Sequence, residues 1–177
     1  MYLTTDRLLI RNFEVKDWQA VHEYTSDQNV MKYLPEDVFT EAAAKEFVKE
    51  NMDETPKHYP VVLNDENFVI GHMAFHKYFG EHTYEIGWVF NPKYYYKGYA
   101  TEAARAILAC GFEKMKLHRI IATCQPENVA SFRVMEKIGM RSEGHFKKCI
   151  PQGDEWWDEY YYAILAEEWV KIGPVYK

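Results

Sequence analysis

The stretch Tyr94–Ala103, Tyr-Tyr-Tyr-Lys-Gly-Tyr-Ala-Thr-Glu-Ala, places a single glycine directly before a run with helical character. The first turn of a helix leaves four backbone N–H groups unpaired and carries about half a positive charge, and this combination binds phosphate. Gly98 lets the backbone approach an anion closely and permits unusual φ and ψ angles. Lys97 adds a cation or is simply solvated. The stretch therefore predicts either an anion-binding loop or a plain connecting turn.

Two common phosphate-binding motifs are absent from this junction. A Walker A loop requires G-x-x-x-x-G-K-[ST], and a Rossmann fingerprint requires three glycines and an acidic residue about 20 positions later. Only Gly98 is present, and His118 and Arg119 occupy the position of the acidic residue. If the loop binds phosphate, it belongs to another class of site.

The composition bounds the class of protein. A chain of 177 residues suits one domain, which we place at 1–177. The three cysteines, Cys110, Cys124 and Cys149, are odd in number and widely spaced, which is typical of reduced, cytoplasmic thiols and not of a zinc site. No long apolar run and no signal peptide are present, so we expect no membrane partner.

The charge is unevenly distributed. The net charge of −6 argues against nucleic-acid binding. Residues 1–92 carry 8 Lys/Arg and 16 Asp/Glu, a net −8, whereas residues 93–148 carry 11 and 5, a net +6. The positive block begins at the glycine stretch. Either this block meets an anion and the acidic part meets a cation, or both are solvated faces.

Hydrophobic periodicity and turn residues predict seven strands and four helices. Thr40 and Asp17 are candidate helix N-caps, and Gly139 is a candidate C-cap. The predicted strands are Arg7–Phe13, 59–63, 68–78, Tyr84–Phe90, Arg119–Cys124, 140–148 and 155–165. The first predicted helix begins after Asp17, and the other three cover Thr40–Met52, Thr101 to about Lys116, and 127–140. The order indicates a mixed α+β domain.

At this point the sequence resembles a known family. Gly98-Tyr99-Ala100-Thr101-Glu102-Ala103 looks like the acyl-CoA pyrophosphate loop of GNAT acetyltransferases, whose pattern is [Q/R]-x-x-G-x-[G/A]. Gly98 and Ala100 match, and Tyr95 departs from the Gln/Arg position. The contacts at that loop are largely from the backbone. We interpret the three tyrosines before Gly98 as wedges that fix the loop between strand and helix.

The resemblance extends over nearly the whole chain. "LTTDRLLIRNF", "EIGWVFNPKYYYKGYATEA", "HRIIATCQPENVASFRVMEKIGM" and "WWDEYYYAIL" are similar, in this order, to segments of the RimJ/RimL-type branch, which acetylates N-termini of ribosomal proteins. The family implies a GNAT fold, a central twisted, mostly antiparallel sheet of about 6–7 strands with a splayed central strand pair and about 4 helices.

The implied reaction is transfer of an acetyl group from acetyl-CoA to an amine that attacks the thioester directly, with no metal. The backbone of Trp88, Val89 and Phe90 would pair with the pantetheine arm, and one N–H there would hold the oxyanion. For the side chains of Trp88 and Phe90 we favour core packing. The residues that the resemblance assigns to CoA are Trp88, Val89, Phe90, Tyr95, Tyr96, Lys97, Gly98, Tyr99, Ala100, Thr101, Asn128 and Ser131.

Three residues are candidates for catalysis. Asn128 and Ser131 lie three apart at a helix start and face the same side. Asn128 would contact the pantetheine or acetyl end and Ser131 would protonate the leaving thiolate; the alternative is an N-cap with Ser131 in the first turn. Glu85, early on the central strand, is the candidate base, with Asp158 and Glu159 as rivals, and each is equally consistent with a surface carboxylate.

The acceptor is an amine. Deprotonating an α-amine at pH 7 costs about 1 kcal/mol and a lysine amine about 4.6 kcal/mol, so a site without a strong base suits N-terminal amines. The acidic N-terminal half suits a cationic acceptor such as a basic protein N-terminus. Alternatives are a small-molecule amine (a polyamine, amino acid or antibiotic) and a CoA-binding module without turnover. Both a monomer and a homodimer are compatible with the sequence.

Overall fold

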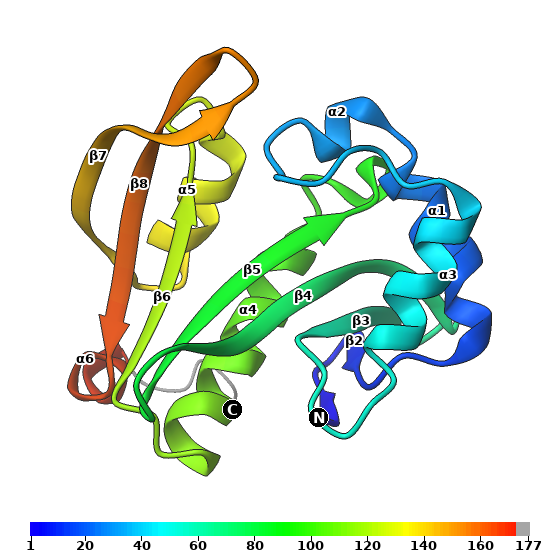
Figure 1. Ribbon diagram of the computed structural model, residues 1–177. Helices are drawn as coiled ribbons and strands as arrows, with labels where there is room; N and C mark the ends of the chain where they lie inside the picture. The colour runs from blue at the N-terminus through cyan, green and yellow to red at the C-terminus, as the bar shows by residue number, and fades with distance from the viewer. Residues whose placement is uncertain (173–177) are drawn as a thin grey trace. The chain divides into compact units, whose positions relative to one another are not determined.

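The computed structural model describes residues 1–172, which form eight strands and six α-helices (Figure 1). The strand order in the sheet is β1-β2-β3-β4-β5-β6-β8-β7. The described strand pairs are antiparallel apart from β5 with β6. The α+β fold with a mostly antiparallel sheet is thus confirmed. The elements that were not predicted from the sequence are short and include β1 (Leu3–Thr4), α2 (Gln28–Met31), the 3₁₀ helix Pro92–Tyr94 and α6 (Ala166–Ile172).

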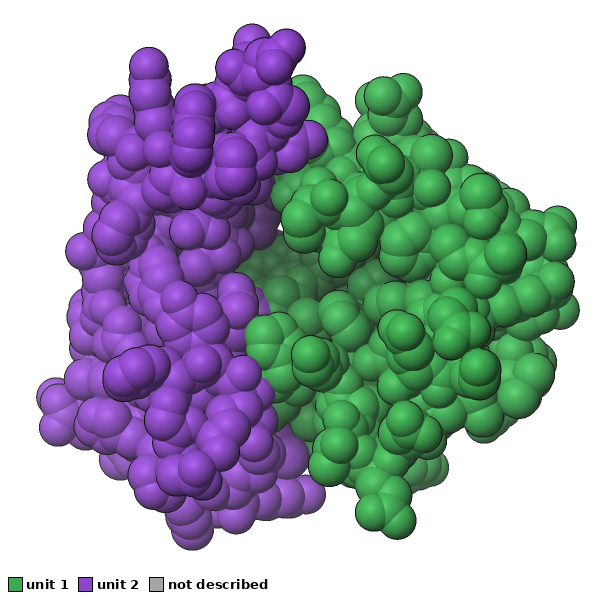
Figure 2. Space-filling view, viewed as in Figure 1, with its two compact units in different colours: residues 1–76, 87–107 green, residues 77–86, 108–177 purple. Residues whose placement is uncertain are grey.

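The chain divides into two compact units, coloured separately in Figure 2. The first comprises Met1–His76 and Gly87–Ile107, and the second begins with Lys77–Ile86 and resumes at Leu108. Strands β4 (Phe68–Phe79) and β5 (Thr83–Phe90) each contribute residues to both units. No helix within residues 1–172 is long and apolar enough to cross a membrane.

The first unit combines antiparallel strands with helices. Its β2–β3 ladder pairs Leu8 with Leu63, and its β3–β4 ladder contains an irregularity at Val61/Val62. Thr40 accepts a hydrogen bond from the Ala43 N–H, which confirms it as an N-cap. The remaining elements of this unit are β2 (Leu8–Ile10), β3 (His58–Leu63), α1 (Trp18–Thr25), α3 (Glu41–Glu50) and most of α4 (Tyr99–Ala109).

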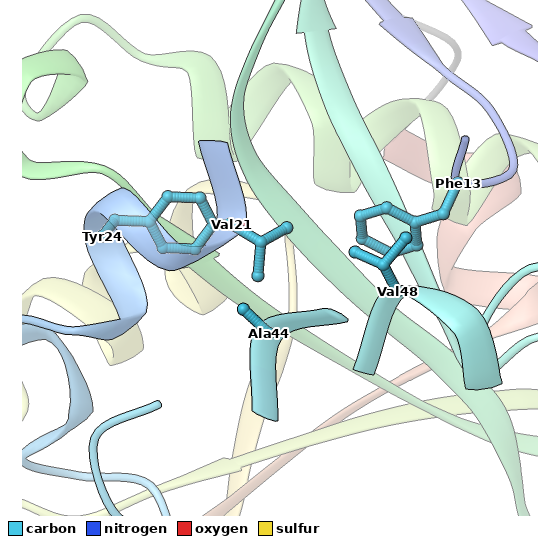
Figure 3. Close-up of a cluster of buried hydrophobic side chains, with 5 residues drawn as sticks. All are labelled: Phe13, Val21, Tyr24, Ala44 and Val48. Carbon is cyan, nitrogen blue, oxygen red and sulfur yellow. The ribbon is translucent and has the colours of Figure 1, made fainter. Parts of the chain in front are cut away.

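A cluster of buried side chains joins α1 to α3. Val21 and Tyr24 of α1 face Ala44 and Val48 of α3, and Phe13 closes the cluster (Figure 3). Each of the five side chains is at most 4% exposed. Burial of one such large apolar side chain contributes about 1.5–3 kcal/mol, so this cluster is what holds the two helices together.

The prediction that the Asp17 side chain caps α1 is wrong. Asp17 stands at the N-cap position, but its carboxylate makes no cap hydrogen bond to α1. It instead accepts two hydrogen bonds from Arg11, at 2.7 and 2.9 Å, and one from the Glu14 N–H. Arg11 and Asp17 are both buried, and a buried guanidinium takes the carboxylate in preference to a helix N–H because its charge needs a partner.

The second unit is a three-stranded ladder with two helices. Strand β6 (Arg119–Cys124) has the predicted bounds, and β8 (Glu155–Leu165) lies between it and β7 (Arg141–Gln152). The β5–β6 pairing covers only Thr83–Glu85 with Arg119–Ile121 and then stops, as expected for a splayed pair. Helix α5 (Val129–Lys137) ends before Gly139, whose φ of 92° confirms the predicted C-cap glycine.

Two imidazoles are packed together in the first unit. The ring centroids of His58 and His72 lie 5.4 Å apart, and Phe47 contacts both rings. His72 Nδ1 is 2.8 Å from the Tyr24 hydroxyl, and within the described residues His58 Nδ1 has no hydrogen-bond partner. Burial lowers the pKa of His58 to about 4 and holds the pKa of His72 well below its usual value. Both rings are therefore neutral in the folded protein.

We predict that stability falls between pH 6.5 and pH 4. In this window the unfolded chain binds protons on these histidines that the folded chain excludes, so their contribution is complete above about pH 6.5 and is lost on acidification. The shift at His58 alone corresponds to about 3 kcal/mol. Denaturant unfolding of His58→Gln across this pH range should show a shallower pH dependence than wild type. The exposed His82→Gln serves as control, and equal slopes for His58→Gln and wild type would contradict the prediction.

Candidate functional site

The glycine stretch forms the junction between β5 and α4 in the first unit. After β5 ends at Phe90, Asn91 caps a short 3₁₀ turn, Pro92–Tyr94, by accepting from the Lys93 N–H. Helix α4 begins at Tyr99, two residues before the predicted start at Thr101, and so follows Gly98 directly. Tyr96 (φ 61°) and Gly98 (φ 81°) both adopt left-handed backbone conformations. Gly98 therefore supplies the conformational freedom that the sequence predicted.

The backbone N–H groups of this junction are unpaired. Among the described residues, none of the six N–H groups from Tyr96 to Thr101 donates a hydrogen bond. The first bond of α4 runs from the Glu102 N–H to the Gly98 carbonyl, at 3.0 Å. A run of donors without acceptors at a helix N-terminus carries partial positive charge. The junction has the chemistry of an anion site, which favours the anion-binding loop over a plain turn.

The first unit holds this loop from the side of α1. The Glu23 carboxylate accepts from Lys93 Nζ at 2.5 Å and from Asn91 Nδ2 at 3.3 Å. These contacts lower the pKa of Glu23 and raise that of Lys93, chiefly through their mutual hydrogen bond. Because the Glu23 carboxylate accepts these two hydrogen bonds, it is already paired and does not accept from the N–H groups of Tyr96–Thr101.

The interpretation of all three tyrosines as wedges is wrong. Tyr94 does pack, with its ring 6.5 Å from Phe68 and 6.4 Å from Tyr99. Tyr95 is 43% exposed and Tyr96 is 100% exposed, so the Tyr96 ring wedges nothing. The left-handed backbone at Tyr96 directs its side chain into solvent, and no local pattern of tyrosines predicts that conformation. Lys97 Nζ lies 5.2 Å from the Tyr94 ring centroid.

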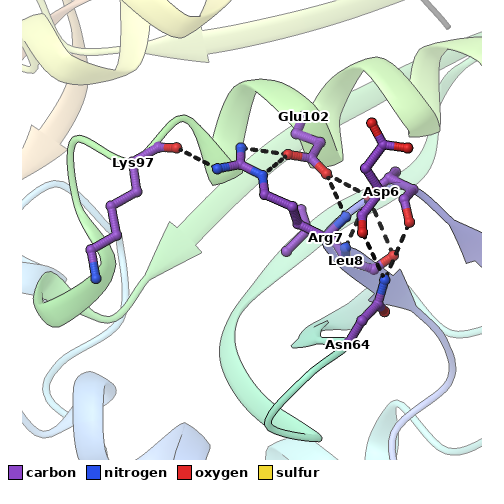
Figure 4. Close-up of polar contacts among 7 residues, drawn as sticks. Asp6, Arg7, Leu8, Asn64, Lys97 and Glu102 are labelled. Atoms are coloured by element: carbon purple, nitrogen blue, oxygen red, sulfur yellow. Dashed lines mark hydrogen bonds and ion pairs between the residues drawn. The ribbon is translucent and has the colours of Figure 1, made fainter. Parts of the chain in front are cut away.

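Arg7 and Glu102 also belong to the loop, and the sequence analysis assigned them no role. The Arg7 side chain extends from the turn before β2, donates to the Glu102 carboxylate through Nε at 2.7 Å and to the Lys97 carbonyl at 3.1 Å (Figure 4). The guanidinium also lies 4.5 Å from the Tyr99 ring centroid. Arg7 and Glu102 are 95 residues apart, so no spacing rule could have paired them.

The end of β5 lies next to the loop in the chain. Phe90 is buried, which confirms core packing for that side chain, and Val89 packs against the α1–α3 cluster. A side chain at Gly71 of β4 would clash with this segment, because its Cβ would lie 2.5 Å from the Val89 carbonyl oxygen. Gly71 therefore permits the close approach of β4 to Val89 and Phe90. Trp88 is half-buried.

In the second unit, Asn128 and Ser131 occupy the start of α5. Asn128 is the N-cap, and its Oδ1 accepts from the Ser131 N–H at 3.3 Å. The Asn128 amide N–H₂ has no partner among the described residues. The Ser131 side chain interacts with the thiol of Cys124, whose pKa burial raises to about 11. The capping role is therefore observed, and it leaves the amide donors of Asn128 available to a ligand.

Glu85, on β5, contacts the face of β6 opposite to the one that Ser131 contacts. Thr123 Oγ1 donates to Glu85 at 3.5 Å, whereas Ser131 contacts the neighbouring Cys124. Because adjacent strand residues point to opposite faces, the candidate base and the candidate acid are on opposite sides of β6. The structure does not place their side chains in contact.

Asp158 is poorly suited to be the base. Its carboxylate accepts from the Lys148 N–H at 2.8 Å and from Lys147 Nζ at 3.1 Å, and His145 Nε2 lies 2.8 Å away. The first of these contacts contributes most to lowering the pKa of Asp158 to about 2. A carboxylate with so low a pKa is a weak proton acceptor. Glu159 stays a rival to Glu85.

The comparison with protein families decides the class. Residues 7–141 match the model of the acetyltransferase (GNAT) domain. The chain belongs to the GNAT acetyltransferase family. The match begins at Arg7 and includes the loop, β5 and the start of α5. This GNAT protein is an N-acetyltransferase, and the members of its family use acetyl-CoA as the acyl donor.

Individual relatives agree with this assignment. The chain is 71% identical over 169 residues to YnaD, an uncharacterized N-acetyltransferase of Bacillus subtilis, covering 96% of this chain and 99% of that protein. It is 70% identical to a GNAT-family acetyltransferase of known crystal structure from Bacillus anthracis, with a TM-score of 0.92 and coverage of 94% and 99%.

Two more distant relatives have named acceptors. The [ribosomal protein uS5]-alanine N-acetyltransferase of Escherichia coli is 26% identical, with 94% of this chain and 92% of that protein covered. The Vibrio cholerae spermidine N-acetyltransferase, crystallised with CoA and spermine, has a TM-score of 0.80 at 21% identity, with 94% and 99% covered. At that identity the second likeness concerns the fold alone.

We predict that capping and ligand binding at Asn128 can be separated. Serine caps helices about as well as asparagine, whereas alanine costs about 1 kcal/mol of stability. Asn128→Ser should therefore keep the melting temperature and still raise the KM for acetyl-CoA, because it lacks the amide donors. Asn128→Ala should lower the melting temperature and also raise the KM for acetyl-CoA. A wild-type KM in Asn128→Ser would reduce Asn128 to a cap.

Proposed function

We propose that this GNAT enzyme binds the pyrophosphate of acetyl-CoA on the loop Tyr95–Thr101 and acetylates a protein or peptide N-terminal amine. The observation that carries the donor assignment is the run of six unpaired N–H groups from Tyr96 to Thr101. Buried or ligand-facing N–H groups need acceptors, and a pyrophosphate supplies several. The residues present therefore fit the CoA group that the family uses.

The rest of the donor would follow β5. The backbone of Trp88, Val89 and Phe90 is assigned to the pantetheine arm, with one N–H holding the oxyanion. The resemblance assigns Asn128, in the second unit, to the pantetheine or the acetyl end of the donor. These assignments are supported by the resemblance and by the unpaired Asn128 donors.

The reaction itself needs one base and one acid. The amine nitrogen forms a bond to the acetyl carbonyl carbon, the C–S bond breaks, nitrogen loses a proton and the thiolate gains one. We assign the base to Glu85 and the acid to Ser131; because they lie on opposite faces of β6, the amine would approach the thioester from the Glu85 side and the thiolate would leave toward Ser131. Cys124, the buried cysteine beside Ser131, has a pKa of about 11 and stays a neutral thiol, which makes it a poor nucleophile and favours direct attack by the amine.

The acceptor class is argued from proton affinity and charge. An α-amine costs about 1 kcal/mol to deprotonate at pH 7 and a lysine amine about 4.6 kcal/mol. Weak base catalysis by Glu85 is enough for the former. The acidic residues 1–92 suit a basic N-terminus, and the distant uS5-alanine acetyltransferase supports membership of the RimJ/RimL-type branch.

A small amine such as a polyamine is the second candidate. The likeness in fold to the spermidine enzyme favours it, and the same acidic residues suit a polycation. The non-catalytic CoA-binding module is not retained, because the family and the 71% identical relative are named as acetyltransferases.

The loop assignment predicts a difference between two isosteric variants. At φ 81° a side chain at Gly98 is strained, and asparagine and aspartate tolerate this conformation similarly. Gly98→Asn and Gly98→Asp therefore differ mainly in charge. We expect Gly98→Asp to bind CoA at least about tenfold more weakly than Gly98→Asn in calorimetry, which is about 1.4 kcal/mol. Equal CoA affinities of the two variants would contradict the assignment of this loop to the pyrophosphate.

The acceptor class is tested by acetyl-CoA consumption across N-terminal peptides, polyamines and amino acids. We expect the highest kcat/KM with a basic N-terminal peptide and lower values when its α-amine is blocked and only a lysine amine remains. A preference for spermidine would establish the second candidate. With the best acceptor, Ser131→Ala should lower kcat more than CoA affinity, and Glu85→Gln should shift the pH–rate profile; an unmoved profile removes Glu85 as the base.

A further inference from the structure

We infer that Arg7 is a positioning residue for the CoA loop, which neutralises Glu102 and fixes the direction of the Gly98 N–H. The inference rests on the proposed function, because it concerns how the same loop accepts a pyrophosphate. It is carried by the contacts that converge on Glu102 and the Lys97 carbonyl (Figure 4).

Glu102 poses an electrostatic problem for this site. It lies in the first turn of α4, at the helix end that carries the free N–H groups. A carboxylate there interacts favourably with the helix dipole but repels an anionic ligand at the same helix end. Its side chain is only 12% exposed, so solvent screens it poorly.

Arg7 neutralises this carboxylate. Its Nε and a terminal nitrogen approach Glu102 Oε2 at 2.7 and 2.5 Å. The other oxygen, Oε1, accepts from the Thr5 hydroxyl at 2.6 Å and from the Arg7 N–H at 3.2 Å. Both oxygens of Glu102 thus point to the turn before β2, and its charge is balanced by the guanidinium.

Arg7 also orients one peptide group of the loop. A terminal nitrogen of its guanidinium donates to the Lys97 carbonyl at 3.1 Å. In a planar trans peptide the C=O and the following N–H point in opposite directions. Holding the Lys97 carbonyl therefore directs the Gly98 N–H away from Arg7. The residues on either side of Lys97, Tyr96 and Gly98, both have left-handed backbone conformations. Stacking of the guanidinium on Tyr99, 4.5 Å from the ring centroid, fixes the arginine itself.

The two roles predict a specific pattern of variants. Arg7→Ala should weaken acetyl-CoA binding about tenfold to thirtyfold, the effect of losing charge-assisted hydrogen bonds, with kcat at saturating acetyl-CoA within about twofold of wild type. Glu102→Gln alone leaves the Arg7 guanidinium without this carboxylate and should bind acetyl-CoA at least as tightly as wild type. Combining it with Arg7→Ala should recover at least about threefold of the lost affinity, because the carboxylate that lost the Arg7 guanidinium is gone.

Two further variants serve as controls. Arg7→Lys keeps the charge, but a single ammonium cannot reproduce the planar fork that reaches both Glu102 and the Lys97 carbonyl, so its affinity should fall between those of wild type and Arg7→Ala. Arg141→Ala removes another arginine, one that pairs with Glu143 and Glu168 in the second unit, and should leave acetyl-CoA affinity unchanged.

The measurement is calorimetric titration of each variant with acetyl-CoA, together with steady-state kinetics and a melting curve to check folding. The inference is overturned if Arg7→Ala binds acetyl-CoA like wild type. It is also overturned if Glu102→Gln adds to the defect of Arg7→Ala instead of relieving it, because the pair then only ties β2 to α4. If wild type itself fails to bind acetyl-CoA, the proposed function fails and the inference with it; wild-type binding with an unaffected Arg7→Ala removes the inference alone.

Discussion

Within the described residues, the six consecutive backbone N–H groups from Tyr96 to Thr101 at the β5–α4 junction donate no hydrogen bond, and acidic side chains that contact this junction are paired with other groups. Any acidic side chain nearby would satisfy them and fill the site. Glu23 and Glu102 are the acidic groups tied to this loop, and both are taken up elsewhere, Glu23 by Asn91 and Lys93 and Glu102 by Arg7 and Thr5. These donors therefore keep their partial positive charge without an acidic partner among the described residues, which is a general property of anion sites at helix N-termini.

The polar side chains at the start of α5 are only partly used in hydrogen bonds within the part of the protein that the structure describes. Asn128 uses its side-chain carbonyl oxygen to cap the helix, and its amide N–H₂ has no partner among the described residues. Ser131, in the first turn of α5, interacts with Cys124 at the end of β6, a cysteine that burial keeps protonated. A thiol that stays protonated is a poor nucleophile.

Local signals predicted local features well. Thr40, Asn128 and Gly139 act as caps because a cap is decided within four residues of the helix end. Strand β6 has its predicted bounds because it is a short apolar run between polar turns. The same kind of reasoning failed for Asp17, since a buried arginine six residues earlier in the chain competes for its carboxylate, and for Tyr96, whose left-handed backbone is set by the loop as a whole.

The sequence alone indicated the α+β architecture and the glycine before the helix, because these depend on residue type, periodicity and short motifs, and its resemblance to the GNAT family was confirmed by the family match. Only the tertiary structure paired Arg7 with Glu102 and with the Lys97 carbonyl, and only it placed Glu85 and Ser131 on opposite faces of β6. Such contacts join residues that are far apart along the chain. Their formation depends on how strands and helices pack, and no local pattern of residues encodes that.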